Sequence, residues 1–141
     1  MPPATRPRAP GALRVAEYND PARRPFVGYV TVALDAGQLG ESDVVTTVPA
    51  GYRPVIDTVT VHVKVPTGQR ATYLYVSASG PVLYIPLSFS GSYSGLDHYQ
   101  GLGQVQMYAD PSKIMYATWQ RSFTSGAASA SFGISGHFVR L

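Results

Sequence analysis

Cysteine is absent from the 141 residues of this chain, which excludes disulfides, thiolate metal sites and cysteine nucleophiles. Charged residues are scarce, at 13% of the sequence. No apolar run approaches the roughly 18 residues that a membrane-spanning helix needs. The first 25 residues also lack the apolar core of a secretory signal peptide. We therefore expect a soluble chain that is not inserted into a membrane.

The residues that usually carry catalysis are few and scattered. The segment GSYSG at 91–95 has Tyr93 where a nucleophile elbow has serine, and GLG at 101–103 lacks the third glycine of a dinucleotide fingerprint. The acidic residues show no pairing of the kind that a glycosidase uses. We expect neither an enzyme nor a cofactor.

The histidines likewise give no sign of a metal site. They share no metal-ligand spacing, although a trimer could bring one from each chain to a shared axis. The three are His62, His98 and His137. We expect no metal site within one chain.

Turn-forming and strand-forming residues are abundant. Glycine occurs 14 times, proline 12 times and tyrosine 10 times, with many valines and threonines, which is typical of short strands joined by turns. The sequence therefore predicts an all-β fold, an antiparallel β-sandwich of jelly-roll type with about eight strands. The strands are expected at residues 26–34, 43–48, 55–65, 71–78, 81–88, 104–109, 113–121 and 129–139.

The run VIDTVTVHVKV at 55–65 alternates most regularly. Its period of two places Asp57 with the valines on the buried face and Ile56, among others, on the opposite face. Turn signals after this run and the next predict that residues 55–88 form a meander. Trp119 is expected in the core or at a subunit interface rather than at a ligand site, and Gly136 is expected at a bulge or a close approach of two backbones.

The N-terminal segment differs from the rest of the chain. Residues 1–25 hold six of the twelve prolines and carry a net charge of +3, whereas residues 26–141 are neutral. We expect an extended arm at 1–25, followed by a single domain at 26–141. An acidic protein surface is the favoured partner of the arm, and nucleic acid contact or a free arm are the alternatives. Its five arginines are Arg6, Arg8, Arg14, Arg23 and Arg24.

The segment at 89–103, FSGSYSGLDHYQGLG, is predicted to be a long loop that binds a ligand. Its rings and polar groups resemble those of recognition loops, and a sugar is a sensible ligand because aromatic rings stack on its CH groups while a carboxylate accepts from its hydroxyls. The alternative is that the tyrosines pack on the domain itself or on a neighbouring subunit. The candidate ligand residues are Tyr93, Asp97, His98 and Tyr99.

A compact corner, VPAGYRP at 48–54, precedes the alternating run. The two prolines fix φ at its ends, the glycine permits a left-handed turn, and the tyrosine and arginine can close the core edge and bind free carbonyls. We therefore expect a structural device rather than a binding surface. Its residues are Pro49, Gly51, Tyr52, Arg53 and Pro54.

This corner, together with the β-runs on both sides of it over residues 26–88, resembles the β-sandwich head domains at the C-termini of tailed-bacteriophage tail fibres and receptor-binding minor tail proteins. The resemblance implies a non-enzymatic homotrimer on the virion exterior that is attached to the tail by its arm and recognises host surface glycan. A capsid decoration protein, held to the head by the arm, is the alternative. A stand-alone carbohydrate-binding module and a glycan hydrolase are further alternatives.

Overall fold

The computed structural model describes residues 23–77, 82–108 and 114–141, and every regular element in this part is a β-strand. No helix in those ranges is long and apolar enough to cross a membrane. The all-β prediction is confirmed, with nine strands where about eight were expected. They are β1 (Arg23–Leu34), β2 (Gly40–Thr47), β3 (Tyr52–Pro66), β4 (Ala71–Ser77), β5 (Val82–Tyr84), β6 (Ser88–Tyr93), β7 (Leu96–Tyr108), β8 (Ile114–Arg121) and β9 (Ala128–Arg140).

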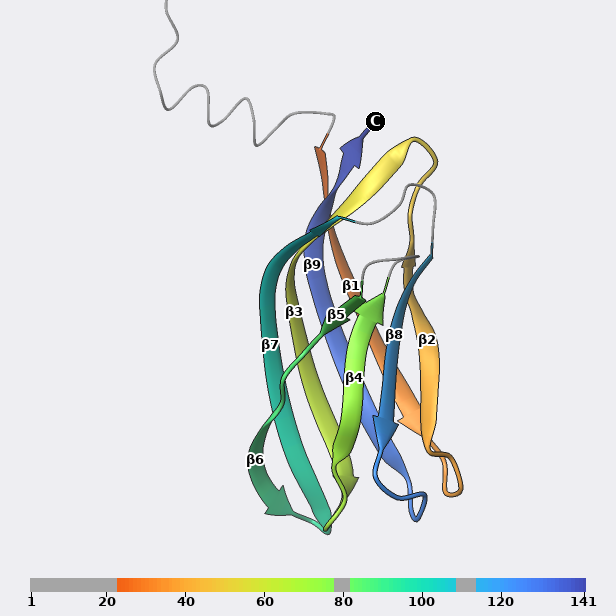
Figure 1. Cartoon of the computed structure of the whole chain (residues 1–141), viewed down its shortest axis with the longest axis vertical. Coiled ribbons are helices and arrows are strands. Elements are labelled where there is room, and N and C mark those ends of the chain that lie inside the picture. The colour runs from red at the N-terminus through yellow and green to blue at the C-terminus, as the bar shows by residue number, and fades with distance from the viewer. Residues whose placement is uncertain (1–22, 78–81, 109–113) are drawn as a thin grey trace, which may run out of the picture.

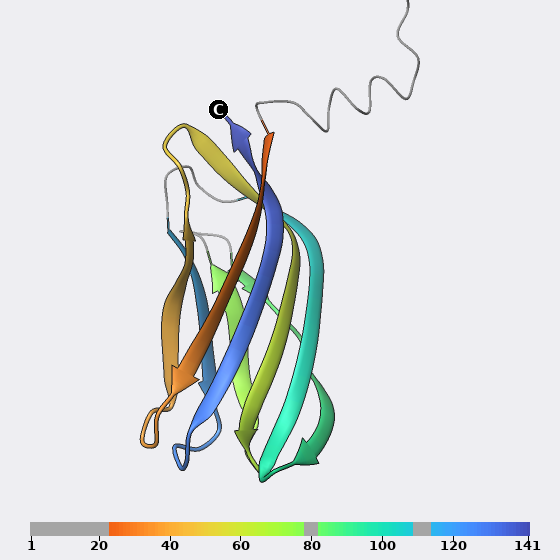
Figure 2. The ribbon, with the colours of Figure 1, turned by 180° about the vertical axis from the view of Figure 1, so that it is seen from behind.

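The strands form two antiparallel sheets that pack face to face as a β-sandwich (Figure 1). One sheet has five strands in the order β1-β9-β3-β7-β6, four of which lie side by side in the view from behind (Figure 2). The other has four strands in the order β2-β8-β4-β5. Successive strands mostly alternate between the sheets, so the core lies between two layers that the chain crosses repeatedly.

The pairing of strands follows a mirrored order along the chain. β1 pairs with β9, β2 with β8, β3 with β7 and β4 with β5, as in a long hairpin whose two arms are rolled up together. Lateral pairing of β3 with β9 and of β4 with β8 then completes each sheet. This is the connectivity of a jelly roll, with β6 added at one edge. The jelly-roll type predicted from the sequence is therefore the observed fold.

The core confirms most of the alternation predicted for 55–65. The five valines of this run are between 0% and 4% exposed, and Trp119 is fully buried with its indole N–H donating to the Val32 carbonyl at 3.0 Å. The prediction is wrong at the start of the run, where Ile56 is buried and the Asp57 side chain is 42% exposed. A register shift between Ile56 and Thr58 causes this reversal, because an extra residue exchanges the two faces of a strand.

Two further topology predictions need correction. Residues 55–88 do not form a meander, because β3 lies in the five-stranded sheet while β4 and β5 pair in the other. Residues 89–103 are not a long loop, since β6 and β7 form a tight hairpin that turns at Ser94 and Gly95. Glycine and serine in this segment serve a bulge and a turn: Gly91, Ser94 and Gly95 all have positive φ.

Gly136 lies where two strands approach closely. A Cβ at this position would overlap the carbonyl oxygen of Val55 and would lie 3.1 Å from the Phe26 ring. The register shift of β3 is opposite this glycine, between its partners Gly136 and Ser135. The predicted close approach is therefore present, and the bulge next to it belongs to the partner strand.

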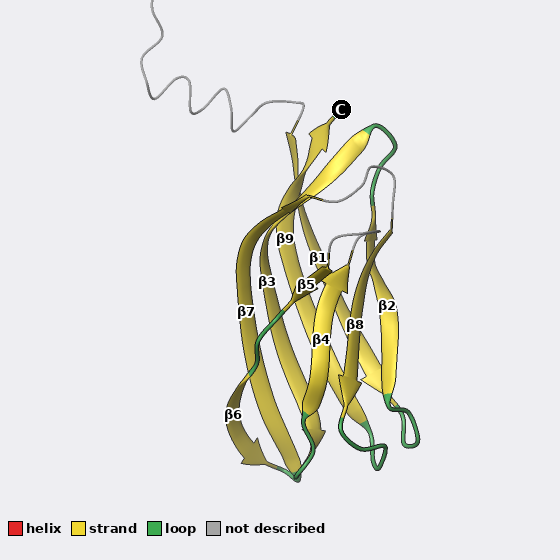
Figure 3. Ribbon diagram, viewed as in Figure 1, coloured by secondary structure: helices red, strands yellow, loops and turns green. Residues whose placement is uncertain are grey.

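The connections gather at the two ends of the sandwich (Figure 3). The start of β1, the turn at 48–51 and the C-terminus lie at one end, which we call the arm end (Figure 1). The connections 35–39, 67–70, 94–95 and 122–127 lie at the opposite end. β1 therefore begins at the same end of the sandwich as the corner and the C-terminus.

Candidate functional site

The arm end brings the start of β1 against the predicted corner. The Arg24 guanidinium lies over the Tyr52 ring at 4.8 Å from its centroid, a cation–π contact, and the Leu141 N–H donates to the Gly51 carbonyl at 2.9 Å. The first strand, the corner and the last residue are thus tied together. β1 begins at Arg23, three residues before the expected start of the domain at 26. The other arm arginines, Arg6, Arg8 and Arg14, lie outside the described residues.

The corner has the local geometry that its residues predict. Gly51 has a φ of 79°, and the Tyr52 N–H donates to the Pro49 carbonyl at 3.2 Å, which closes a turn. Tyr52 is partly buried against the core, Pro54 is buried, and Arg53 is exposed. The turn in this segment connects β2 of the four-stranded sheet to β3 of the five-stranded sheet.

The four candidate ligand residues occupy the β6–β7 hairpin but do not form one surface. Asp97 is only 8% exposed, and its carboxylate accepts from the Ser92 hydroxyl and, at 2.9 Å, from the Gly68 N–H. These two hydrogen bonds lower the pKa of the Asp97 carboxyl. The Tyr99 hydroxyl donates to the Gln69 carbonyl at 3.3 Å. Both polar groups therefore hold the hairpin to the 67–70 turn.

His98 is buried between two other rings. It is 3% exposed, its Nδ1 lies 3.0 Å from Nε2 of His62, and the Tyr93 ring stacks on it at a centroid distance of 3.9 Å. Its Nε2 has no hydrogen-bond partner among the residues that the structure describes. Partial burial lowers the pKa of His62, and the nearby His98 and Lys64 lower it further. Of the four residues, Tyr93 alone presents most of its side chain, 62%, to solvent.

The His62–His98 pair was not predicted from the sequence. The residues are 36 positions apart, and the alternation of 55–65 indicates only that His62 lies on the outer face. Their meeting depends on the β3–β7 register, in which His62 is opposite Gln100 and Lys64 is opposite His98. His137 lies elsewhere and contacts Asp57 at 3.2 Å. Across the described ranges, no group of three or more His, Asp or Glu side chains is arranged to hold a metal ion.

Arg121 is a second polar residue that the sequence did not single out. It is 1% exposed, and its guanidinium donates to the carbonyls of Asp35 and Gln38 at 3.1 and 3.0 Å. It also donates to the carbonyls of Thr124 and Ser125 and to the Gln69 side chain. One side chain thus links three connections at the end opposite the arm, namely 35–39, 67–70 and 122–127.

Comparison with known proteins gives a likeness of fold. No protein-family model matches this chain, and no curated protein sequence matches it. Among solved structures, a chain of the cyanophage Pam1 capsid asymmetric unit aligns with a TM-score of 0.50 and 14% sequence identity. The alignment covers 96% of this chain and 94% of that chain, so the two have nearly the same length. At this identity the likeness concerns the fold.

Proposed function

We propose that this chain is a non-enzymatic structural protein of a phage virion that is anchored to the capsid surface by its N-terminal arm. The observation that carries the proposal is the end-to-end likeness to a chain of a cyanophage capsid unit. A single jelly roll preceded by a basic segment fits a decoration protein, which needs one compact domain and one anchor. The jelly roll is also an architecture that viral capsid proteins use repeatedly, which supports the proposal by analogy.

The two ends of the sandwich differ in structure, which supports anchoring by one of them. β1 begins at the arm end, where Arg24 packs on Tyr52, whereas the opposite end is held by the buried Arg121. The net charge of +3 in residues 1–25 suits an acidic capsid surface rather than a neutral one. In this arrangement the arm binds the shell and the far connections face outward. Homotrimers are proposed as the attached form, because threefold contacts would give the arms avidity.

Labelling of virions tests the location. Particles that incorporate a tagged copy are expected to show the tag on the head by electron microscopy. Deletion of residues 1–22 is expected to abolish incorporation while the purified chain still unfolds cooperatively. Attachment of the full chain is expected to weaken as salt rises, since the contact is electrostatic. Absence of the chain from purified virions would contradict the whole proposal.

A tail-fibre head domain is the second candidate, and the VPAGYRP corner favours it. The corner forms the turn at the arm end, where the Leu141 N–H donates to the Gly51 carbonyl. The labelling experiment separates the two candidates, because tags confined to the tail would support this one and refute the capsid location. Native mass measurement is expected to show a trimer in either case. A monomer at micromolar concentration would remove the trimer from both.

A further inference from the structure

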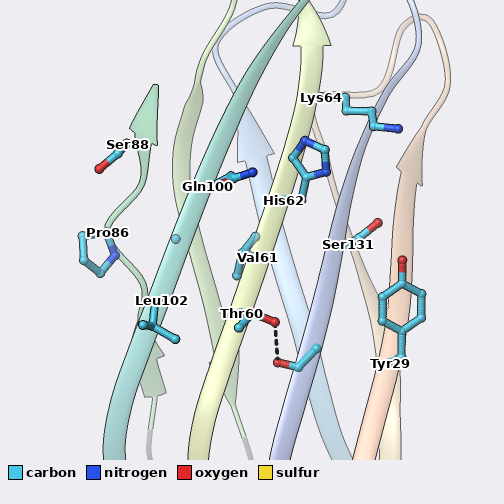
Figure 4. A pocket seen from close by; sticks show the side chains of 12 residues that line it. Tyr29, Thr60, Val61, His62, Lys64, Pro86, Ser88, Gln100, Leu102 and Ser131 are labelled. Carbon is cyan, nitrogen blue, oxygen red and sulfur yellow. Dashed lines mark hydrogen bonds between the residues drawn. The ribbon is translucent and has the colours of Figure 1, made fainter. Parts of the chain in front are cut away.

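The outer face of the five-stranded sheet carries an open trough of about 830 Å³ that no function discussed above uses (Figure 4). β1, β9, β3 and β7 provide its floor, and the connection from β5 to β6 provides one flank. Tyr29 lies at one side and Pro86 and Ser88 lie at the other (Figure 4). The trough therefore runs across the strands and is accessible from solvent.

Hydroxyl groups gather on the Tyr29 side of the trough. The hydroxyls of Thr31 and Ser131, which are cross-strand partners, lie 3.0 Å apart. Hydrogen bonds from Ser131 and Thr31 lower the pKa of the Tyr29 phenol, and Lys64 adds to this effect. Hydroxyls at this distance offer paired donor and acceptor positions, which a polyhydroxy ligand can match.

The charge of the lining has one sign. Lys64 and His62 are among the lining residues, and none of the described residues that line the trough carries a carboxylate. The ammonium of Lys64 also acts on both His62 and Tyr29, since it contributes to the lowered pKa of each. An anionic group placed here would meet a cation and several hydroxyl donors without a repelling neighbour.

A glycine keeps the floor open beside the tyrosine. Gly133 is the cross-strand partner of Tyr29 on one side and of Thr60 on the other. A Cβ at 133 would lie 2.7 Å from the Thr60 hydroxyl oxygen, which donates to the Gly133 carbonyl at 3.4 Å (Figure 4). Because the glycine leaves this flank free, the Tyr29 side chain is 71% exposed and its ring face is available for stacking.

Two properties of the trough, its paired backbone and its openness, exclude some classes of ligand. Inner strands of a sheet already pair their N–H and C=O groups, so a peptide cannot add to this face as a strand. The trough is also too open to serve as the enclosed apolar pocket that small hydrophobic ligands require. Hydroxyl pairs, an exposed ring and one cation remain as the recognition groups.

We propose that this trough binds an acidic saccharide. The CH face of one sugar ring stacks on Tyr29, ring hydroxyls exchange hydrogen bonds with Ser131, Thr60 and Gln100, and the sugar carboxylate pairs with Lys64. The site is distinct from the β6–β7 hairpin predicted from the sequence, where Asp97 and Tyr99 have partners inside the fold. It also does not depend on whether the chain sits on the head or the tail.

Calorimetric titration of the full chain with trigalacturonic acid tests the proposal, with maltotriose as the neutral trisaccharide and inorganic phosphate as the free oxyanion. Trigalacturonic acid is expected to bind more tightly than either, and more weakly as salt rises. The Lys64→Gln variant is expected to lose about tenfold in affinity for trigalacturonic acid. Tyr29→Ala is expected to lose a similar factor, because the ring no longer stacks.

Matched variants on other surfaces serve as controls. Arg70→Gln removes the same charge, and Tyr84→Ala removes a ring that is 64% exposed on the other sheet. Both are expected to bind trigalacturonic acid like the unaltered chain. Equal binding of phosphate and trigalacturonic acid would overturn the saccharide class. No measurable binding, or binding unchanged by Lys64→Gln and Tyr29→Ala, would overturn the site.

Discussion

Arg121 is a buried cation whose hydrogen-bond partners in the described structure are four backbone carbonyls and one side-chain amide. Burial lowers the pKa of its guanidinium, since the charged form loses water, but the ordinary value is so high that the group stays protonated. The five hydrogen bonds replace that water. Arg121 therefore stabilises the fold by holding three connections together through hydrogen bonds rather than by forming an ion pair.

Replacement of Arg121 by methionine is expected to lower the free energy of unfolding by about 3 kcal/mol, because several buried carbonyls lose their donor. Arg121→Lys should recover part of this loss, since an ammonium has three donors but not the planar spread of a guanidinium. The exposed Arg70→Met is the matched control, with an expected change within about 0.5 kcal/mol. Chemical denaturation measures all three. Equal effects of Arg121→Met and Arg70→Met would refute the role.

The lowered pKa values of His62 and Asp97 lead to a prediction of how the stability of the fold depends on pH. Both have a pKa below the ordinary value in the folded state, so the unfolded chain binds more protons than the folded one as pH falls. The contribution of His62 is complete above its ordinary pKa of 6.5 and is lost as pH falls through its lower, folded value. That of Asp97 is complete above 3.8 and is lost only below it.

The free energy of unfolding is therefore expected to decline in two pH windows. His62→Gln should flatten the first decline, below pH 6.5, and Asp97→Asn should flatten the second, below pH 3.8. Denaturant unfolding at a series of pH values measures both. Each variant serves as the control for the other, since it should leave the other window in place. A first decline that survives in His62→Gln would show that another group causes it.

At the scale of elements, the strands fit together through a few positions without side chains. Gly136 allows β9 to approach the carbonyl of Val55 on β3, next to the register shift that buries Ile56. Phe26 and Phe138 stack across this region with their centroids 4.5 Å apart. The register shift of β3, the glycine at 136 and the stacked phenylalanine rings together align β1, β3 and β9 near the arm end.

Gly136→Ala is expected to lower the free energy of unfolding by about 2 kcal/mol or more, because the new methyl group overlaps backbone that cannot move alone. Gly103→Ala, on β7, is the matched control. Its Cβ would have no neighbour nearer than 3.7 Å, and its φ is not in the left-handed region, so between zero and about 1 kcal/mol of stabilisation is expected. Thermal and denaturant unfolding compare the two. Equal tolerance would mean that the strands are less tightly fitted.

At the scale of the whole molecule, the fold joins the two ends of the described chain. β9 lies between β1 and β3, so the last strand completes the sheet that the first strand begins. Pairing of distant segments is slow to form because a long loop must close first. The jelly roll should thus fold as one cooperative unit, on the millisecond-to-second scale that is typical of β-sandwiches.

Removal of residues 128–141 is expected to abolish cooperative folding, because β1 and β3 then lose their shared partner. Removal of residues 1–22 is the control and should leave the unfolding temperature within a few degrees of that of the full chain, since both sheets are complete from Arg23. Circular dichroism during heating measures both. If the chain without residues 1–22 failed to fold, the arm would belong to the core.

The sequence by itself determined the local structure of this protein. Alternating valines specified a strand at 55–65, glycine specified the left-handed turn at 51, and the apolar surroundings of Trp119 specified its burial. These depend on period, φ and hydrophobicity, which neighbouring residues encode. The fold class followed from them as well.

Only the tertiary structure decided which distant residues meet. The contact of His62 with His98, the five bonds of Arg121 and the grouping of Tyr29, Ser131 and Lys64 in the trough all depend on strand register across tens of residues. Strand pairing also makes residues 89–103, which were expected to form a loop, part of the β6–β7 hairpin. The polar groups of Asp97 and Tyr99 in this hairpin form hydrogen bonds with the 67–70 turn. The reason is physical: a one-residue shift exchanges the two faces of a strand, and no local pattern states which strand will be its neighbour.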